Sequence, residues 1–143
     1  MIPSDKYESI MRVLPILCVD IIVKTESGKY ILIKRKNRPL SGRWWVIGGR
    51  VLKDEPLEQA AKRKVKEETD LDIKEIRPIG YYEDTFVANP FGTRFRQHSV
   101  SLVFLAIVEE NQDVKLDYQS IAWKYSKVLP RRFQVKPFGC LQT

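Results

Sequence analysis

Residues 49–71 begin with GRVLKDE (49–55) and end with RKVKEETDL (63–71), which sets one glycine, one arginine and three glutamates at spacings that chance rarely supplies. At about 100° per residue, one face of a helix in this stretch is mostly small and apolar. That face carries Leu57, Ala60, Ala61, Lys64 and Glu68. Pro56 suits a first helical position, where a missing N–H costs nothing, so a helix is predicted from there to about Thr69. Asp70 can end it because aspartate tolerates the left-handed conformation.

Glu68 lies on the inward face of this predicted helix. An unpaired buried carboxylate is costly, so it either protonates or binds a cation. The cation is either a metal ion or Lys64, which stands four residues earlier. A Lys64–Glu68 pair contributes only a few tenths of a kcal/mol when it is exposed. Helix geometry alone therefore leaves both interpretations open.

The pattern resembles the Nudix box of the Nudix (MutT-like) hydrolases, G-x5-E-x7-R-E-U-x-E-E-x-G-U with U an aliphatic residue. In that family a loop, a helix and a loop hold a divalent cation against a substrate diphosphate. The positions in register are Gly49, Glu55, Arg63, Val65, Glu67, Glu68 and Leu71. Two positions depart, since Lys64 replaces the glutamate after the arginine and Asp70 replaces the terminal glycine. The resemblance implies an α/β fold, a Nudix-type α/β/α sandwich with a mixed sheet, and it favours Glu68 as a metal ligand.

Outside the box, the first half of the chain is similar to one branch of that family, the GDP-mannose mannosyl hydrolases. The residues that carry this likeness are Asn37-Arg38-Pro39, Gly42, Trp44, Gly48-Gly49-Arg50-Val51, Lys53-Asp54-Glu55 and Leu57-Glu58, together with 17–36. That branch characteristically lacks the glutamate that Lys64 replaces. Its enzymes send water to the anomeric carbon of the sugar, so that GDP leaves, whereas ordinary Nudix enzymes send water to phosphorus.

The branch resemblance also implies a set of site residues. The expected metal ligands, for Mg²⁺ or alternatively Mn²⁺, are Gly48, Gly49, Glu68 and Gln97. The expected catalytic residues are His98 as general base, Glu67, and Arg63, which would orient Glu67 and brace the box. The expected substrate-binding residues are Asp20, Arg35 and Arg50. Histidine suits the task of a base because its unperturbed pKa is about 6.5.

Gln97 and His98 are adjacent in a predicted strand, which raises a geometric difficulty. Successive side chains of a strand point to opposite faces, so His98 shares a face with Val100 and Leu102 whereas Gln97 points away from them. Both can serve one site only if the strand has a bulge or ends there. A half-buried structural histidine is the alternative interpretation.

Composition limits the class of protein. With 143 residues, 43% of them hydrophobic and 30% charged, the chain suits one globular domain spanning 1–143, with the box at 49–71. The longest apolar run, 13–23, is interrupted by Pro15 and Asp20 and falls short of the ~20 residues that a bilayer requires. Asp5 and Glu8 do not suit a signal peptide. We therefore expect a cytoplasmic protein with no membrane partner.

The net charge of +7 is spread along the chain rather than concentrated. Lysines and arginines are interleaved with aspartates and glutamates, which favours a solvated basic surface over a nucleic-acid-binding one. A nucleotide-sugar substrate is the expected partner, and a homodimer is left open. Cys18 and Cys140 are too few for a disulfide framework.

The remaining sequence predicts alternating extended and looped segments. A short helix is expected near 4–12, and another after Lys127, before a frayed end. Strands are expected at 16–24 and 30–36, joined by the turn Glu26-Ser27-Gly28, and at 44–46, 73–86 as one or two pieces, 95–108 and 119–126. Residues 37–43 and 88–92 are expected to be loops.

Three functions fit these patterns. The favoured one is Mg²⁺-dependent hydrolysis of a nucleoside diphosphate sugar such as GDP-mannose. The nearest alternative is a conventional Nudix pyrophosphohydrolase acting on a nucleoside triphosphate or an ADP-sugar, with Glu67 and Glu68 holding metal despite Lys64. The more distant alternative is a non-catalytic nucleotide- or RNA-binding module, in which the ammonium of Lys64 occupies the metal position.

Overall fold

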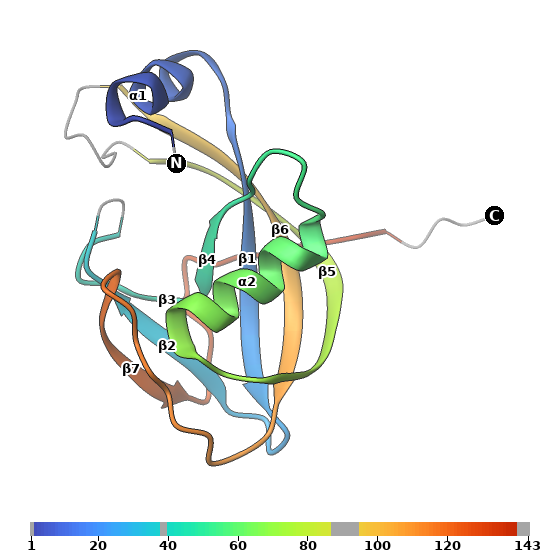
Figure 1. Ribbon diagram of the computed structural model, residues 1–143. Helices are drawn as coiled ribbons and strands as arrows, with labels where there is room; N and C mark the ends of the chain where they lie inside the picture. Colours follow the sequence, from blue (N-terminus) through green and yellow to red (C-terminus); the bar gives the residue numbers. More distant parts are fainter. Residues whose placement is uncertain (1, 38–39, 87–94, 140–143) are drawn as a thin grey trace.

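The computed structural model describes residues 2–37, 40–86 and 95–139, which form a twisted mixed sheet and two helices (Figure 1). The helices are α1 (Ser4–Val13) and α2 (Leu57–Thr69). The strands are β1 (Ile16–Thr25), β2 (Tyr30–Arg35), β3 (Trp44–Trp45), β4 (Ile47–Arg50), β5 (Ile73–Phe86), β6 (Gln97–Val108), β7 (Ser120–Ser126) and β8 (Lys136–Pro137). The predicted α/β class with a mixed sheet is confirmed.

The centre of the sheet is the parallel pairing of β1 with β6, which runs from Ile16 opposite Ser99 to Thr25 opposite Val108. The other strand pairs are antiparallel, and the main path through the sheet is β3-β2-β1-β6-β5-β8. Strand β1 divides its other edge between two partners. Residues 18–21 pair with β4, whereas Val23 and Lys24 pair with β2.

Helix α2 packs its small apolar face on one side of the sheet, as its periodicity predicted. Ala60, Ala61 and Val65 are fully buried against Val19 and Ile21 of β1. Small residues allow the helix to approach the sheet closely, and burying them removes apolar area from water at about 25 cal/mol per Å².

The ends of α2 follow the predicted signals to within one residue. Pro56 is extended, at φ −60° and ψ 142°, and precedes the first helical residue rather than occupying that position. Asp70 ends the helix in the left-handed conformation at φ 59°, and its N–H donates to the carbonyl of Lys66. The substitution of aspartate for the box glycine therefore leaves the helix end intact.

The opposite face of the sheet is covered by the segment after β7. Phe133 packs against Trp45 and Tyr82, with ring centroids 5.4 and 5.2 Å apart, and Leu129 and Val135 complete the cluster. The short helix expected after Lys127 is wrong for residues 127–139, where the chain makes turns and the short strand β8. Prolines in this segment limit helix formation, and the aromatic contact fixes an extended path.

Other elements match or refine the expectations. Gly28 has φ +95°, which supplies the positive φ of the β1–β2 turn. Residues 73–86 form one strand rather than two, with register shifts near Ile73 and Pro78. The loop expected at 88–92 lies outside the described residues. Neither described helix combines the length and the apolar character that crossing a bilayer requires.

Gly80 provides a test of the packing of β8. A Cβ at Gly80 would fall against the carbonyl oxygen of Lys136 and 2.8 Å from Cγ1 of Val135. Gly80→Ala is therefore expected to destabilise the chain by about 1–3 kcal/mol, the usual cost of overpacking. Gly139→Ala is the matched control, because no described atom lies within 4 Å of a Cβ there. Thermal unfolding of both variants measures the difference, and equal melting temperatures would contradict this packing.

Candidate active site

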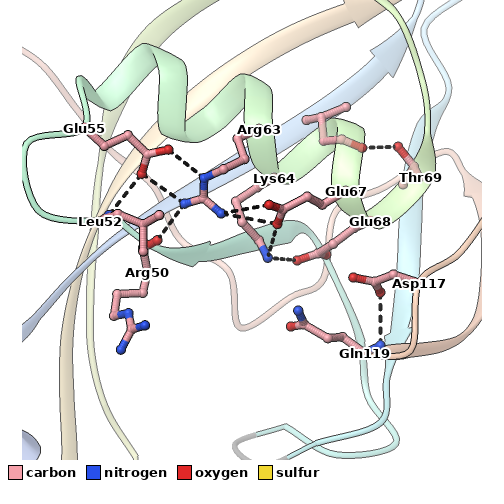
Figure 2. A network of polar contacts seen from close by, with 11 residues as sticks. Arg50, Leu52, Glu55, Arg63, Lys64, Glu67, Glu68, Thr69, Asp117 and Gln119 are labelled. Atoms are coloured by element: carbon pink, nitrogen blue, oxygen red, sulfur yellow. Dashed lines mark hydrogen bonds and ion pairs between the residues drawn. The ribbon is translucent and has the colours of Figure 1, made fainter. Parts of the chain in front are cut away.

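Arg63 joins the two halves of the box. Its Nε lies 2.6 Å from Glu55 Oε1 and its Nη2 lies 3.0 Å from Glu55 Oε2, which is a two-pronged, charge-assisted contact (Figure 2). The same Nη2 donates to the carbonyl of Arg50 at 3.1 Å, and Glu55 Oε2 accepts the N–H of Leu52 at 3.0 Å. The Arg63 guanidinium lowers the pKa of Glu55. These contacts fasten the loop after β4 to helix α2.

Glu67 extends this network toward solvent. Arg63 Nη1 lies 3.2 Å from Glu67 Oε2, and the Glu67 side chain is 47% exposed. The predicted contact between Arg63 and Glu67 is therefore present. Glu67 is the most accessible carboxylate of the three glutamates in the box network.

Lys64 and Glu68 form a buried ion pair. Lys64 Nζ lies 2.8 Å from Glu68 Oε1 and 3.6 Å from Glu67 Oε2 (Figure 2), and the side chains of Lys64 and Glu68 are only 7% and 2% exposed. Burial raises the pKa of Glu68, and the neighbouring ammonium opposes that rise. The structure thus shows the lysine pairing that helix geometry had left open.

A cavity of about 180 Å³ lies against the face of the paired strands β1, β4 and β6 that carries Asp20. Most of the residues expected to bind substrate or metal meet in its lining. They are Asp20, Arg35, Gly48, Gly49, Arg50 and Gln97. They come from four strands that are separate in the sequence, β1, β2, β4 and β6. The fold therefore brings a carboxylate and two arginines together in one hollow.

Asp20 is the buried carboxylate of this cavity, which we call the Asp20 cavity. Burial raises its pKa to about 6, while a hydrogen bond from Ser101 and the charge of Arg35 act in the opposite direction. Gly48 stands beside it, because a Cβ at Gly48 would collide with Asp20 Oδ1 and would lie 2.7 Å from the carbonyl oxygen of Val19. A glycine is therefore required where β4 passes the carboxylate.

Several cavity residues were not predicted from the sequence. Ser99 and Ser101 share the face of β6 with Gln97, so strand alternation was a usable signal for them. Tyr7 of α1 contacts Arg50, whose guanidinium carbon lies 4.5 Å from the centre of the ring, and no local pattern indicated this contact. Cys18 also lines the cavity, where burial raises the pKa of its thiol to about 12.

His98 points to the other face of β6. Its Nε2 lies 3.2 Å from Glu83 Oε1 on β5, and its side chain is 41% exposed. Strand β6 begins at Gln97, as one of the two expected conditions required, but its pairing with β5 is regular over both residues, with Thr85 opposite His98 and Phe86 opposite Gln97, so no bulge turns the two side chains to one face. The structure therefore brings Gln97 to the Asp20 cavity and leaves His98 outside its described lining.

A second, larger hollow of about 660 Å³ adjoins the first, and we call it the box hollow. Its described lining is Gly49, Arg50, Leu52, Arg63, Lys64, Glu67, Asp117, Tyr118 and Gln119. Gly49, Arg50 and Gln119 line both spaces. The two hollows therefore share part of their walls, at Gly49, Arg50 and Gln119.

Comparison with known proteins agrees with this geometry, since the model of the NUDIX domain matches residues 14–128. The chain belongs to the Nudix family. It is 29% identical over 118 residues to the low-salt glycan biosynthesis protein Agl8 of Haloferax volcanii, covering 82% of this chain and 74% of that protein. It is 37% identical over 91 residues to an ADP-ribose pyrophosphatase of Methanocaldococcus jannaschii, covering 64% of this chain but only half of that protein.

Solved Nudix structures show the same fold. A MutT NUDIX hydrolase from Burkholderia pseudomallei superposes with a TM-score of 0.69 at 24% identity, covering 85% of this chain and 91% of that one. This likeness shows that the chain has the Nudix fold.

Nudix hydrolases generally use divalent metal ions, so the carboxylates of the box can be tested for such a site. Glu55 already binds Arg63, and Glu68 already binds Lys64. Across residues 2–37, 40–86 and 95–139, no three histidine, cysteine, aspartate or glutamate side chains are grouped closely enough to hold a metal ion. The arrangement shown does not fit a divalent ion at Glu68, because an ammonium already occupies that position.

The stabilising contacts of Arg63 with Glu55 and the loop can be tested by substitution, with the neighbouring Lys62 as a control. Arg63→Ala is expected to lower stability by about 1–3 kcal/mol, because it removes charge-assisted hydrogen bonds and leaves Glu55 without its partner. Lys62→Ala is the matched control, since Lys62 is half-exposed and lies 3.7 Å from Glu58. The measurements are thermal unfolding and hydrogen exchange of the Leu52 amide. Slow exchange at Leu52 in the Arg63 variant would contradict the brace.

Proposed function

We propose that the chain hydrolyses a nucleoside diphosphate sugar, GDP-mannose or a close GDP-hexose, by sending water to the anomeric carbon of the sugar. The observation that carries this proposal is the Asp20 cavity, in which one buried carboxylate faces two arginines. Water forms the new C–O bond, the bond from the anomeric carbon to the diphosphate breaks, and GDP leaves with the electron pair. Asp20 accepts the proton of the water.

The two arginines are placed to bind the diphosphate leaving group. Arg35 and Arg50 line the same cavity from β2 and β4, and guanidinium groups make strong, often two-pronged hydrogen bonds to phosphate. Donors placed where negative charge develops lower the barrier to bond breaking. Arg50 also lines the box hollow, so a diphosphate held by Arg50 would extend toward helix α2.

Lys64 favours attack at carbon over attack at phosphorus. Phosphoryl transfer depends on positive charge placed around the transferred group, which in metal-dependent enzymes comes from ions held by carboxylates. Here the ammonium of Lys64 engages Glu68 and approaches Glu67. We assign no catalytic step to Mg²⁺ for that reason, although the branch resemblance implies it.

Asp20 and His98 are two candidates for the general base. Asp20 lies in the cavity beside the arginines, and its pKa of about 6 suits proton transfer near neutral pH. His98 was the candidate from the sequence, but it contacts Glu83 on the far face of β6. Geometry favours Asp20, because a base must reach the attacking water directly or through one further water.

The second candidate function is a conventional pyrophosphohydrolase, which the names of two relatives support. One relative is named an ADP-ribose pyrophosphatase, and another, 34% identical over 124 residues, is named an NAD-capped RNA hydrolase from Vibrio vulnificus. This chain spans only 50% and 42% of those proteins. The glycan-biosynthesis name of the Haloferax relative instead supports a nucleotide sugar.

The position of bond cleavage separates the two functions. Incubation with a panel of nucleotide sugars in ¹⁸O-labelled water is expected to release free sugar carrying the label, together with unlabelled GDP. Mass spectrometry of the products is the measurement. Sugar phosphate and nucleoside monophosphate, with label in a phosphate, would show attack at phosphorus and would replace this proposal with the pyrophosphohydrolase.

Paired variants identify the base. Asp20→Asn is expected to lower turnover by roughly 10²- to 10⁴-fold, the usual contribution of a general base, whereas His98→Gln is expected to change it little. Wild-type activity should fall as the pH drops through about 6, because protonated Asp20 cannot accept a proton. An unperturbed histidine titrates in the same range, so the pH profile alone does not distinguish the two residues and the variants are needed.

Stability controls keep this test interpretable. Burial raises the pKa of folded Asp20 from its ordinary 3.8 to about 6, so ionisation of Asp20 works against folding as the pH rises through that interval. Asp20→Asn is therefore expected to keep the melting temperature at pH 7. If His98→Gln loses activity and no longer shows the fall in activity at low pH, while Asp20→Asn keeps both, the base is His98.

A further inference from the structure

The ammonium of Lys64 lies where the box carboxylates of the family pattern would face a cation. It is 2.8 Å from Glu68 Oε1 and 3.6 Å from Glu67 Oε2, and the lysine side chain is 7% exposed. Its stem passes against β4, because a Cβ at Gly49 would lie 2.6 Å from Cε of Lys64. The glycine therefore gives the lysine the room that it needs to reach both glutamates.

The charges of the box agree with this placement. In the network, three glutamates, Glu55, Glu67 and Glu68, face two cations, Arg63 and Lys64, which leaves one negative charge in excess. A glutamate at position 64, as in the family pattern, would leave three in excess. The difference is two charges, which is the charge of one divalent ion. Lys64 therefore neutralises the negative charge that a divalent metal ion would neutralise in a box with the family pattern.

The same ammonium is placed to meet a phosphate. Lys64 lines the box hollow together with Arg50 and Arg63, and Gly49 and Arg50 line both this hollow and the Asp20 cavity. A lysine ammonium has three N–H donors. With Glu68 at 2.8 Å and Glu67 at 3.6 Å from Nζ, one donor is left for an anionic oxygen in the box hollow.

We propose that Lys64 is the resident cation of this site, and that the chain binds a diphosphate without a divalent metal ion. The inference deepens the proposed function and rests on its diphosphate substrate. A compact ammonium can neutralise and hydrogen-bond a phosphate oxygen directly, as lysines do in other phosphate sites.

Calorimetric titration of the full chain with GDP, in EDTA and in Mg²⁺, tests this inference. The wild-type affinity in EDTA is expected to stay within about threefold of the affinity in Mg²⁺, a difference of less than 1 kcal/mol. Lys64→Glu is expected to bind GDP at least about tenfold more weakly in EDTA and to recover in Mg²⁺. Electron paramagnetic resonance of Mn²⁺ without nucleotide is expected to detect a bound ion in Lys64→Glu and none in the wild type.

Lys62→Glu is the matched control, because it makes the same change of charge on an exposed face of the same helix. It is expected to keep the metal-independent affinity of the wild type. Lys64→Met/Glu68→Met guards against misfolding of Lys64→Glu, since replacing a buried ion pair by apolar residues is often neutral or stabilising. The double variant is expected to stay folded and to lose GDP affinity in EDTA.

Three results would overturn the inference: tight Mn²⁺ binding by the wild type, a wild-type affinity for GDP that appears only with Mg²⁺, or an unchanged affinity in the double variant. Failure of the proposed function gives a different result. In that case GDP binds in EDTA as expected, but no nucleotide sugar in the panel is cleaved at carbon. Conversely, cleavage at carbon together with GDP binding that appears only in Mg²⁺ would retain the function and reject the role of Lys64.

Discussion

The parallel pairing of β1 with β6 determines where the side chains of the site lie. Ten successive residues of β1 face β6 in one register, which fixes the faces to which Asp20 and Ser101 point. A shift of one residue would reverse every side chain of a strand between the two faces. Because β1 then gives its other edge to β4 and β2, the arginines of both strands are brought to the same hollow.

The box combines the buried apolar face of α2 with a network of paired charges. Arg63 and Glu55 fasten the loop to α2, and Lys64 with Glu68 fills the buried space below. Removing two charges from water is costly, and a buried pair is favourable only when geometry and further hydrogen bonds compensate. The charged motif of the box therefore holds the loop against the helix, and in our proposal Lys64 also supplies positive charge to the substrate diphosphate. In the proposed function the rest of the substrate lies in the neighbouring Asp20 cavity, whose lining shares Gly49 and Arg50 with the box hollow.

Local patterns in the sequence predicted what depends on local geometry. The face of α2 with Ala60 and Ala61, its end at Asp70, and the turn at Gly28 all follow from periodicity and backbone preferences. The partner of Glu68 could not be chosen locally, because a metal and a lysine satisfy the same buried carboxylate. His98 was assigned by resemblance, whereas strand alternation had already placed it opposite Gln97. Tyr7 and Phe133 reach their contacts through tertiary packing, which no periodicity encodes.

The central pairing also sets the order in which the molecule can form. Ile16 pairs with Ser99 far along the sequence, and such non-local contacts slow folding because a long segment must close first. During synthesis, β1, β4 and the whole box leave the ribosome before β6 does. At that stage Asp20 lacks its partner Ser101, the edge of β1 that pairs with β6 is unpaired, and the apolar residues of β1 are exposed. A nascent chain that pauses between α2 and β6 therefore exposes apolar surface and an unpaired strand edge, both of which favour aggregation.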